Sequence, residues 1–474
     1  MTAHPQPPRS TATATRAARA PGGWPVVGHL PHLLRAPLSF LGSLPAHGDL
    51  VEIRLGPRPA FVLCHPELAK QVMADGRTFD RIGPLYEGSR AALGNGLATC
   101  PHADHRRQRL LMQPAFRAEH LAGYADVMRA GIATVVDRWQ PGAVVDIVDE
   151  MFALTTTVAV RTLFGSDVDD HDIGELRDSL DTFLRGVYVR ALLPAVDSVP
   201  TPNSRRYARA LATWRTHVTR IVADRRAGGA DQAERTDGHD LLSRLIAARD
   251  DDGGAMTERE LHDQVAVLIL AGAETTSSTL AWTLHLVANH PDAERALHAE
   301  VDAVLDGGIA TLDDVPRLPW TTKVIRESLR LYPPAWVLPR TTTRDVDLAG
   351  RRVRAGSTIV FSPYILHRHP GFHDDPDRFR PERHSTGVGD SDRSAPDPWS
   401  RSSFVPFGSG PNKCIGDTFA LTETTLALAS IAARWRLRPA DSRPVRPVPR
   451  SVLTPSRLRM RPTPRHAHPP AADA

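Results

Sequence analysis

The chain has 474 residues, of which 41% are hydrophobic, and it carries a formal net charge of +4 with a pI of about 9.2. This length exceeds the usual single-core range of about 250–300 residues, so the chain holds two or three modules or one large fold. Its mild basicity suits an acidic protein partner but is too weak to indicate nucleic-acid binding. Its three cysteines, Cys64, Cys100 and Cys414, are too few and too scattered for a disulfide framework or a zinc site.

The N-terminal half predicts a short β region followed by helices. Residues 1–20 lack an apolar stretch, so we expect a disordered leader and no signal peptide. No apolar run reaches the roughly 18 residues of a membrane span. Alternating apolar residues predict a β-hairpin at 49–66 and a short helix after it. Four glycines indicate a loop at 80–101, and the pattern from 104 to about 226 is mainly helical.

The segment from Glu258 to Asn289 predicts one long helix. It contains no proline and one glycine, Gly272, and Pro291 stops it. Its 32 residues would span about 48 Å at 1.5 Å per residue. The middle, VAVLILAGA, is apolar on every side, as in a buried helix. Polar residues follow it directly, which argues against a membrane span.

The C-terminal part predicts a helix at 319–331, short strands within 344–364 and a helix after Gly416. The polar stretches 225–240 and 385–403 predict a linker and an irregular segment, and we expect a disordered tail at 463–474. No internal repeat is visible. The elements together indicate a mainly α protein with a small β part, folded as a single domain over residues 21–462.

Cys414 lies in an unusual loop, FVPFGSGPNKCIGDTFA, at 404–420. Gly408 and Gly410 can adopt positive φ and let the backbone approach a flat ligand. The thiol precedes a helix whose N-terminus favours a thiolate. No histidine lies nearby as a base, so a metal ligand is favoured over a nucleophile, and one thiolate suits iron in a macrocycle. A buried structural cysteine is the alternative on spacing alone.

The long helix contains AGAETT at 271–276. The Thr275 hydroxyl can donate to the Ala271 carbonyl in place of the normal ladder bond, and Gly272 lies beside it. We expect this to open or kink the helix and leave a gap for O₂ and a water. The alternative is an ordinary polar patch of i, i+4 hydrogen bonds.

The order F-G-x-G-x-x-x-C-x-G at 407–416 resembles the haem-ligand loop of the cytochrome P450 family. AGAETT is similar to the oxygen-binding motif of that family, and ESLR at 327–330 is similar to its E-x-x-R helix. The resemblance covers about residues 21–462. It implies the cytochrome P450 fold, with haem between the long central helix and the cysteine loop.

The resemblance implies haem b as the cofactor, with Cys414 as the axial thiolate ligand of the iron. It implies that Thr275 takes part in oxygen activation and that Glu274 carries protons to the site. Glu327 and Arg330 share a helix face at i, i+3, and PDRFRPER resembles the segment that supplies a further arginine, Arg383. We assign these last three residues to a structural lock behind the haem loop.

The segment at 102–116 is similar to the helix that reaches a haem propionate. The family often has Trp-x-x-x-Arg there, whereas this chain has His105 and Arg109 on one helix face. Both can donate to a carboxylate, and Arg340 occupies the position of another propionate partner. The alternative is a solvated basic surface. The chain departs from the family at Asn412, where Arg or His is usual.

The resemblance is to soluble bacterial members, in particular actinobacterial sesquiterpene oxidases. It implies a cytoplasmic monooxygenase that uses O₂ and electrons from a ferredoxin and its NAD(P)H-dependent reductase, and acts in terpene and antibiotic biosynthesis. The expected substrate is compact and apolar, such as a pentalenene-like sesquiterpene. Alternatives are a fatty acid, a steroid, a polyketide, a peroxide-using enzyme or a haem carrier. The expected pocket wall comprises Leu85, Tyr86, Leu93, Leu97, Phe183, Val187, Tyr188, Val267, Leu270, Ala271, Ala273, Ala335, Trp336, Val337 and Leu338.

Overall fold

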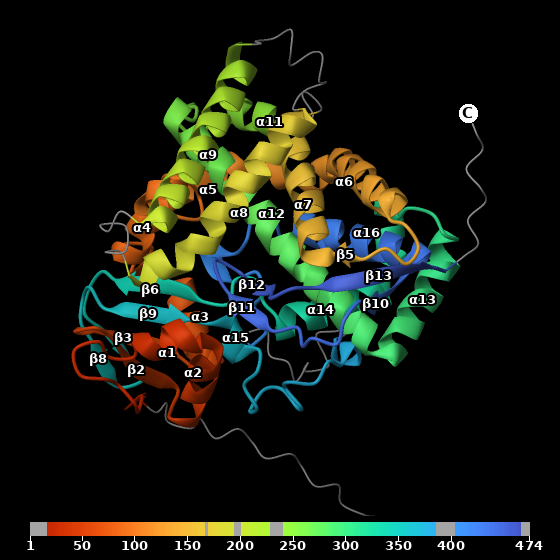
Figure 1. Cartoon of the computed structure of the whole chain (residues 1–474). Coiled ribbons are helices and arrows are strands. Elements are labelled where there is room, and N and C mark those ends of the chain that lie inside the picture. The colour runs from red at the N-terminus through yellow and green to blue at the C-terminus, as the bar shows by residue number, and fades with distance from the viewer. Residues whose placement is uncertain (1–16, 166–168, 194–200, 228–239, 385–402, 466–474) are drawn as a thin grey trace, which may run out of the picture.

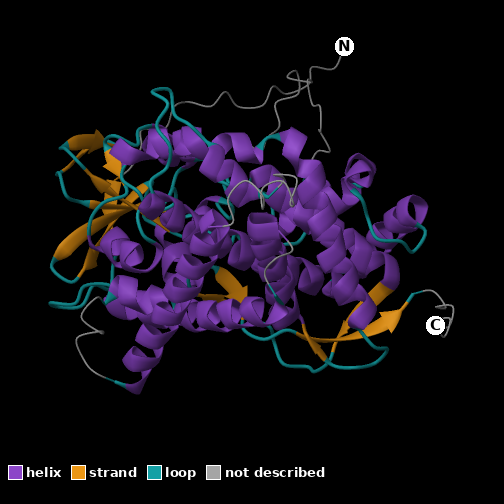
Figure 2. Ribbon diagram, turned by 90° about the horizontal axis from the view of Figure 1, so that it is seen from above, coloured by secondary structure: helices purple, strands orange, loops and turns teal. Residues whose placement is uncertain are grey.

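The computed structural model describes residues 17–165, 169–193, 201–227, 240–384 and 403–465. Helices form one large body, and most strands gather at one end of it (Figures 1 and 2). The helices are α1 (Leu30–Arg35), α2 (Pro37–Ser43), α3 (Pro66–Ala74), α4 (Pro84–Leu93), α5 (His102–Met112), α6 (Ala118–Arg138), α7 (Ile147–Phe164), α8 (Asp170–Leu192), α9 (Pro202–Ala227), α11 (Leu241–Ala247), α12 (Glu258–Asn289), α13 (Pro291–Leu305), α14 (Pro319–Leu331), α15 (Pro363–Leu366) and α16 (Asp417–Arg434).

The strands form one larger sheet and several small ones. They are β1 (Ala17–Arg19), β2 (Leu50–Leu55), β3 (Arg58–Leu63), β4 (Phe79–Asp80), β5 (Val145–Asp146), β6 (Leu338–Thr342), β7 (Val346–Leu348), β8 (Arg351–Val353), β9 (Thr358–Phe361), β10 (Trp435–Pro439), β11 (Pro447–Pro449), β12 (Leu453–Pro455) and β13 (Arg459–Pro464). The six-stranded sheet has the order β1-β2-β3-β9-β6-β4. The small sheets are β10-β13-β5, β11-β12 and β7-β8.

The predicted hairpin is confirmed, because β2 and β3 pair antiparallel from Leu50↔Leu63 to Leu55↔Arg58. The strand β1 pairs parallel with β2, so the expected leader holds ordered residues at 17–19. Residues 1–16 of the leader and residues 466–474 lie outside the described residues, as do most of the expected linker and irregular segment. The strand β13 reaches Pro464, two residues beyond the expected domain end.

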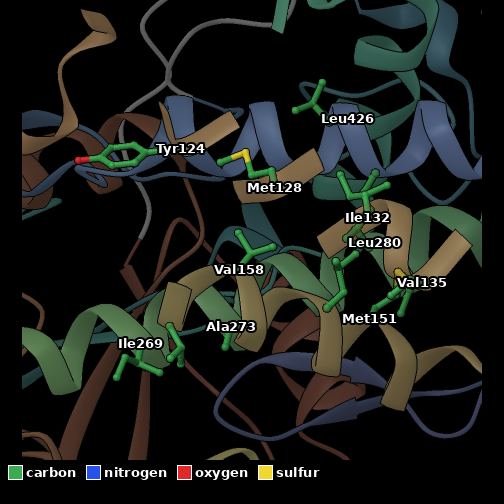
Figure 3. Packing of buried hydrophobic residues seen from close by; sticks show 14 of the residues in the cluster. Tyr124, Met128, Ile132, Val135, Met151, Val158, Ile269, Ala273, Leu280 and Leu426 are labelled. Atoms are coloured by element: carbon green, nitrogen blue, oxygen red, sulfur yellow. The ribbon is translucent and has the colours of Figure 1, made fainter. Parts of the chain in front are cut away.

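The long helix is confirmed with the predicted bounds. Thr257 caps it and forms a capping box with Glu260. Its side chains pack with those of α6, α7 and α16 in the main core, as Figure 3 shows. The helix is long and apolar enough to cross a membrane, but 67% of its most apolar window is buried inside the protein. It is therefore the central core helix of this fold.

The expected loop at 80–101 is wrong, because α4 occupies Pro84–Leu93. Proline is favoured in the first turn of a helix, where its missing N–H costs nothing. Gly94 ends the helix with φ of 68°, a conformation that suits glycine. Glycine and proline thus mark the two ends of a helix here, although their density suggested a loop. The other predicted helices, α3, α14 and α16, are confirmed.

Replacing Gly94 with alanine is expected to destabilise the protein by about 2 kcal/mol or more, because a side chain at positive φ is strained. A Cβ there would also lie 1.8 Å from Oδ1 of Asp263, whose Oδ2 accepts from the Asn95 N–H. Gly88→Ala is the matched control in the same helix, since no described residue lies within 4 Å of its added Cβ. Urea unfolding should show a lower free energy of unfolding for Gly94→Ala and no decrease for Gly88→Ala. Equal unfolding midpoints for the two variants would contradict the strain at Gly94.

Candidate active site

A cavity of about 330 Å³ lies between the middle of α12 and the cysteine loop. The helix contributes Ala271, Gly272 and Thr275, and the loop contributes Phe407, Gly408 and Cys414. The wall is completed by α7, the segment after α14, β6 and the start of α16. Ala271 is exposed on an otherwise buried stretch of helix because it faces this space. The two sequence motifs, at 271–276 and 407–416, therefore face one cavity.

The cysteine loop has the backbone that its glycines predict. Gly408 and Gly410 have φ of 70° and 67°, and a Cβ on Gly410 would lie 2.9 Å from the Met73 carbonyl oxygen. The Cys414 N–H donates to the Phe407 carbonyl at 2.9 Å, which closes the loop. Cys414 lines the cavity, so its accessible surface faces that space although the residue lies deep in the protein, and α16 begins three residues later.

Burial raises the pKa of the Cys414 thiol, and the Gly416 N–H and the cations of Arg109 and Lys413 act in the opposite direction. The surroundings alone therefore do not hold a thiolate. A bound metal ion deprotonates a coordinating thiol outright. The cysteine suits a metal ligand better than a free nucleophile.

Two arginines form a cationic wall of the cavity, Arg81 and Arg340. They are neighbours because β4 pairs antiparallel with β6, with Asp80 opposite Thr341. Arg340 donates to the Tyr86 hydroxyl at 2.8 Å, and Arg81 donates to the Leu97 carbonyl at 2.7 Å. Each guanidinium keeps further N–H donors, so the pair suits a carboxylate group. Arg81 was missed because it lies in the segment expected to be a loop.

His105 lies buried beside the two arginines of the cationic wall, whereas Arg109 contacts the cysteine loop. His105 is buried, and burial together with the nearby charges of Arg81 and Arg109 lowers its pKa to about 4. It is therefore neutral at pH 7 and lies beside the cationic wall. Arg109 donates to the Lys413 carbonyl at 2.6 Å and so ties α5 to the cysteine loop. Neither residue is among the described lining residues, whereas Asn412 is.

Thr275 lines the cavity, and its hydroxyl donates to the Ala271 carbonyl at 2.6 Å, as predicted. The helix is nevertheless continuous through this point, so no break accompanies the bond. Thr279 donates in the same way to the Thr275 carbonyl at 2.9 Å. The ordinary i, i+4 pattern is thus also present.

Glu274 points away from the cavity. Its carboxylate accepts a hydrogen bond from Ser451, in the turn between β11 and β12. Burial raises the pKa of Glu274 to about 7, against the lowering effects of Ser451 and Arg450. Glu274 keeps some accessible surface, but its carboxyl lies deep enough for burial to be the largest cause of the raised pKa. At neutral pH it can therefore both hold and release a proton.

The predicted lock forms around Glu327, which is fully buried. Arg330 reaches its two oxygens at 2.8 and 2.9 Å, and Arg383 reaches it at 3.0 Å. His384 adds a contact of 2.9 Å that sequence reasoning missed. Only the proximity of His384 to Arg383 in the chain hinted at it.

The lock is connected to the cysteine loop through Arg330 and His367. Arg330 donates to the His367 carbonyl at 2.9 Å, and the Nε2 of that histidine accepts from the Val405 N–H at 2.9 Å. Val405 lies at the start of the loop and is buried. The buried carboxylate thus holds the backbone that carries Cys414.

The expected pocket wall is partly wrong. Tyr86, Ala271, Ala335 and Leu338 line the cavity. Most of the others belong to the hydrophobic core, because the elements that carry them pack against neighbours on that side; they are Leu93, Leu97, Phe183, Tyr188, Val267, Leu270, Ala273, Trp336 and Val337. The side chains of Leu85 and Val187 lie outside the described residues.

Comparison with known proteins assigns the chain to a family. The family model described as Cytochrome P450 matches residues 19–461. The chain is 46% identical to cyclooctatin synthase of Streptomyces melanosporofaciens over 94% of this chain and 95% of that protein. It is 44% identical to pentalenene oxygenase of Streptomyces avermitilis, over 95% and 98%. It is also 44% identical to cyclooctat-9-en-7-ol 5-monooxygenase of Streptomyces melanosporofaciens, over 92% of each.

A solved structure agrees with this assignment. The crystal structure of the cytochrome P450DA haem domain matches with a TM-score of 0.83 at 25% identity. It covers 96% of this chain and 99% of the other.

The buried contacts of Glu327 predict that the fold loses stability in acid. Its surroundings lower the pKa of Glu327 from 4.5 to about 2 despite burial, which by itself raises it. The lowered pKa stabilises the fold above about pH 4.5, and this contribution, on the order of 3 kcal/mol, is lost as pH falls towards 2. Burial lowers the pKa of His384, so the unfolded chain binds a proton at this residue more readily than the folded protein does. Below about pH 6.5 this difference also lowers the free energy of unfolding.

The measurement is urea unfolding as a function of pH for the wild type, Glu327→Gln and Glu67→Gln. Glu327→Gln leaves Arg330 buried without its anion, so a loss of about 3–5 kcal/mol is expected at pH 7. Glu67 is 62% exposed, and its substitution should leave the pH profile unchanged. An unaltered unfolding free energy for Glu327→Gln would refute the lock.

Proposed function

Because this chain belongs to the cytochrome P450 family and is a monooxygenase of it, we propose that it oxidises an unactivated C–H carbon of a compact terpene. The oxidant is O₂, and two electrons come from a ferredoxin and its NAD(P)H-dependent reductase in the cytoplasm. The observation that carries this is a largely apolar cavity that holds Cys414 on one side and Thr275 on the other. Relatives named for pentalenene and cyclooctatin support the substrate class.

The charges around the cavity disfavour a fatty-acid substrate. Arg185 pairs with Asp181 at 2.7 Å, and Arg190 lies 3.6 Å over the Tyr207 ring. Neither arginine is among the described lining residues. The cations that do line the cavity, Arg81 and Arg340, stand at the wall suited to the carboxylates of the cofactor. A substrate carboxylate would therefore compete with the cofactor for its donors.

The residues present fit a haem with a thiolate ligand. Cys414 would hold the iron, Arg81 and Arg340 would bind the propionates, and neutral His105 would add a hydrogen bond beside them. Bound in this way, haem supplies the capacity to activate O₂ and oxidise a C–H bond. The positive φ of Gly408 and Gly410 gives the flat group a close approach to the loop backbone.

The side chains of this protein bind, orient and move protons. Aliphatic residues such as Leu268, Leu338 and Ala335 bind an apolar substrate and exclude water. The Thr275 hydroxyl, which donates to Ala271 at rest, can rotate to donate into the cavity. Glu274 can release a proton near neutral pH and so supply the site from its other side. A peroxide-using enzyme would need no such supply, so Glu274 favours the O₂ reaction.

The ligand assignment predicts the effect of Cys414→Ser. The reduced CO complex of the wild type is expected to show the absorption of a haem-thiolate protein, and the variant is expected to lose it while still binding haem. Cys100→Ser is the matched control, since Cys100 is buried away from the cavity lining. Survival of the thiolate-type spectrum in Cys414→Ser would refute the assignment.

The function predicts how Thr275→Ala behaves with a ferredoxin, its reductase and NAD(P)H. The wild type should oxidise members of a panel of polycyclic terpene hydrocarbons and alcohols, with product measured per NAD(P)H consumed. Thr275→Ala should keep the reduction rate but lose roughly tenfold or more in product yield, with electrons recovered as peroxide. Thr283→Ala is the control, because Thr283 lies on the same helix but is fully buried and is not among the described lining residues. An unchanged yield in Thr275→Ala would contradict its role, and oxidation of fatty acids alone would contradict the substrate class.

A further inference from the structure

The β11–β12 hairpin forms hydrogen bonds with three residues of the helix that bears Glu274. Ser278 and Trp282 on α12 donate to the Leu453 carbonyl at 2.7 and 2.9 Å. The Ser451 hydroxyl donates to Oε1 of Glu274. A short hairpin near the C-terminal end of the chain is thus joined to α12 at successive turns.

The same hairpin is joined to the cavity wall. The Leu453 N–H donates to the Pro334 carbonyl at 3.1 Å, and the Trp336 ring N–H donates to the Arg450 carbonyl at 3.0 Å. Pro334 and the adjacent Ala335 line the cavity. The hairpin that holds Glu274 therefore also contacts the cavity wall.

The charges facing Glu274 come from two elements. Arg450 of the turn lowers the pKa of Glu274, and Asp181 of α8 raises it. Arg185, which pairs with Asp181, also acts on Arg450. On α7 the Thr155 hydroxyl, which does not titrate, donates to the carbonyl of the neighbouring Ala273 at 2.7 Å. The side chain of Asp181 is 40% exposed, so this group of charges reaches solvent.

We propose that Ser451 is a positioning residue for Glu274, and that the β11–β12 turn holds the carboxyl on the solvent-facing side of α12. In this arrangement Glu274 takes a proton from water beside the Asp181–Arg185 pair. It then gives one proton towards the Thr275 side, and no electrons move in either transfer. The inference rests on the proposed monooxygenase function for the use of the proton, but the positioning itself is independent of it.

Ser451→Ala is expected to remove the donor and so raise the pKa of Glu274 by about one unit. The pKa is read without turnover, from the protonated carboxyl stretch in infrared difference spectra against Glu274→Gln. Ser451→Thr keeps a hydroxyl and should restore the wild-type value. Ser456→Ala is the matched control, because its hydroxyl accepts from the Arg446 N–H in the same hairpin and does not meet Glu274.

In turnover, Ser451→Ala should lose roughly tenfold in product per NAD(P)H, gain peroxide and change its solvent isotope effect. Its substrate-binding spectrum should be unchanged. A shifted infrared pKa with these effects supports the proposal, and a shift without them overturns the use of Glu274 as a proton carrier. An unshifted pKa, or equal losses in Ser456→Ala, would overturn the positioning role of Ser451. Failure of the wild type to oxidise any terpene would count against the proposed function alone.

Discussion

The buried carboxylate of Glu327 is the interaction on which the position of the cysteine loop depends. Removing a carboxylate from water is costly, and here Arg330, Arg383 and His384 all donate to it. Arg330 then donates to backbone carbonyls in the segment 367–378. Through His367 this segment holds the Val405 N–H. The loop that carries Cys414 is therefore held by buried polar contacts, which tolerate little displacement because each lost partner leaves a desolvated group unsatisfied.

The central helix presents neighbouring residues to two different surroundings. Consecutive residues on an α-helix point about 100° apart. Thr275 therefore lines the cavity, whereas Glu274 meets the β11–β12 turn. The cavity is largely apolar, whereas the Glu274 carboxyl lies near the Asp181–Arg185 pair, which is partly exposed to solvent. One helix meets both surroundings because the cysteine loop lies across the cavity and the hairpin lies behind the helix.

The positive charge at the cavity comes from outside the cysteine loop. Asn412, two residues before Cys414, lines the cavity but supplies only a neutral donor. Arg81 and Arg340, brought together by the pairing of β4 with β6, supply two cations at the same cavity. The buried His105 is neutral beside them, because burial, and after it the nearby positive charges of Arg81 and Arg109, lowers its pKa.

The sequence by itself determined the elements and motifs whose causes are local. The bounds of α12 follow from a capping box and a proline, the hairpin follows from alternation around a turn, and the loop of Cys414 follows from glycines that adopt positive φ. The same kind of local signal gave a wrong prediction at α4, where glycine and proline mark the ends of a helix and not a loop. Only the tertiary structure placed Arg81 beside Arg340, His384 on Glu327 and Ser451 on Glu274. Those contacts join residues between 57 and about 260 positions apart, and their geometry depends on strand pairing and helix packing that no local pattern specifies.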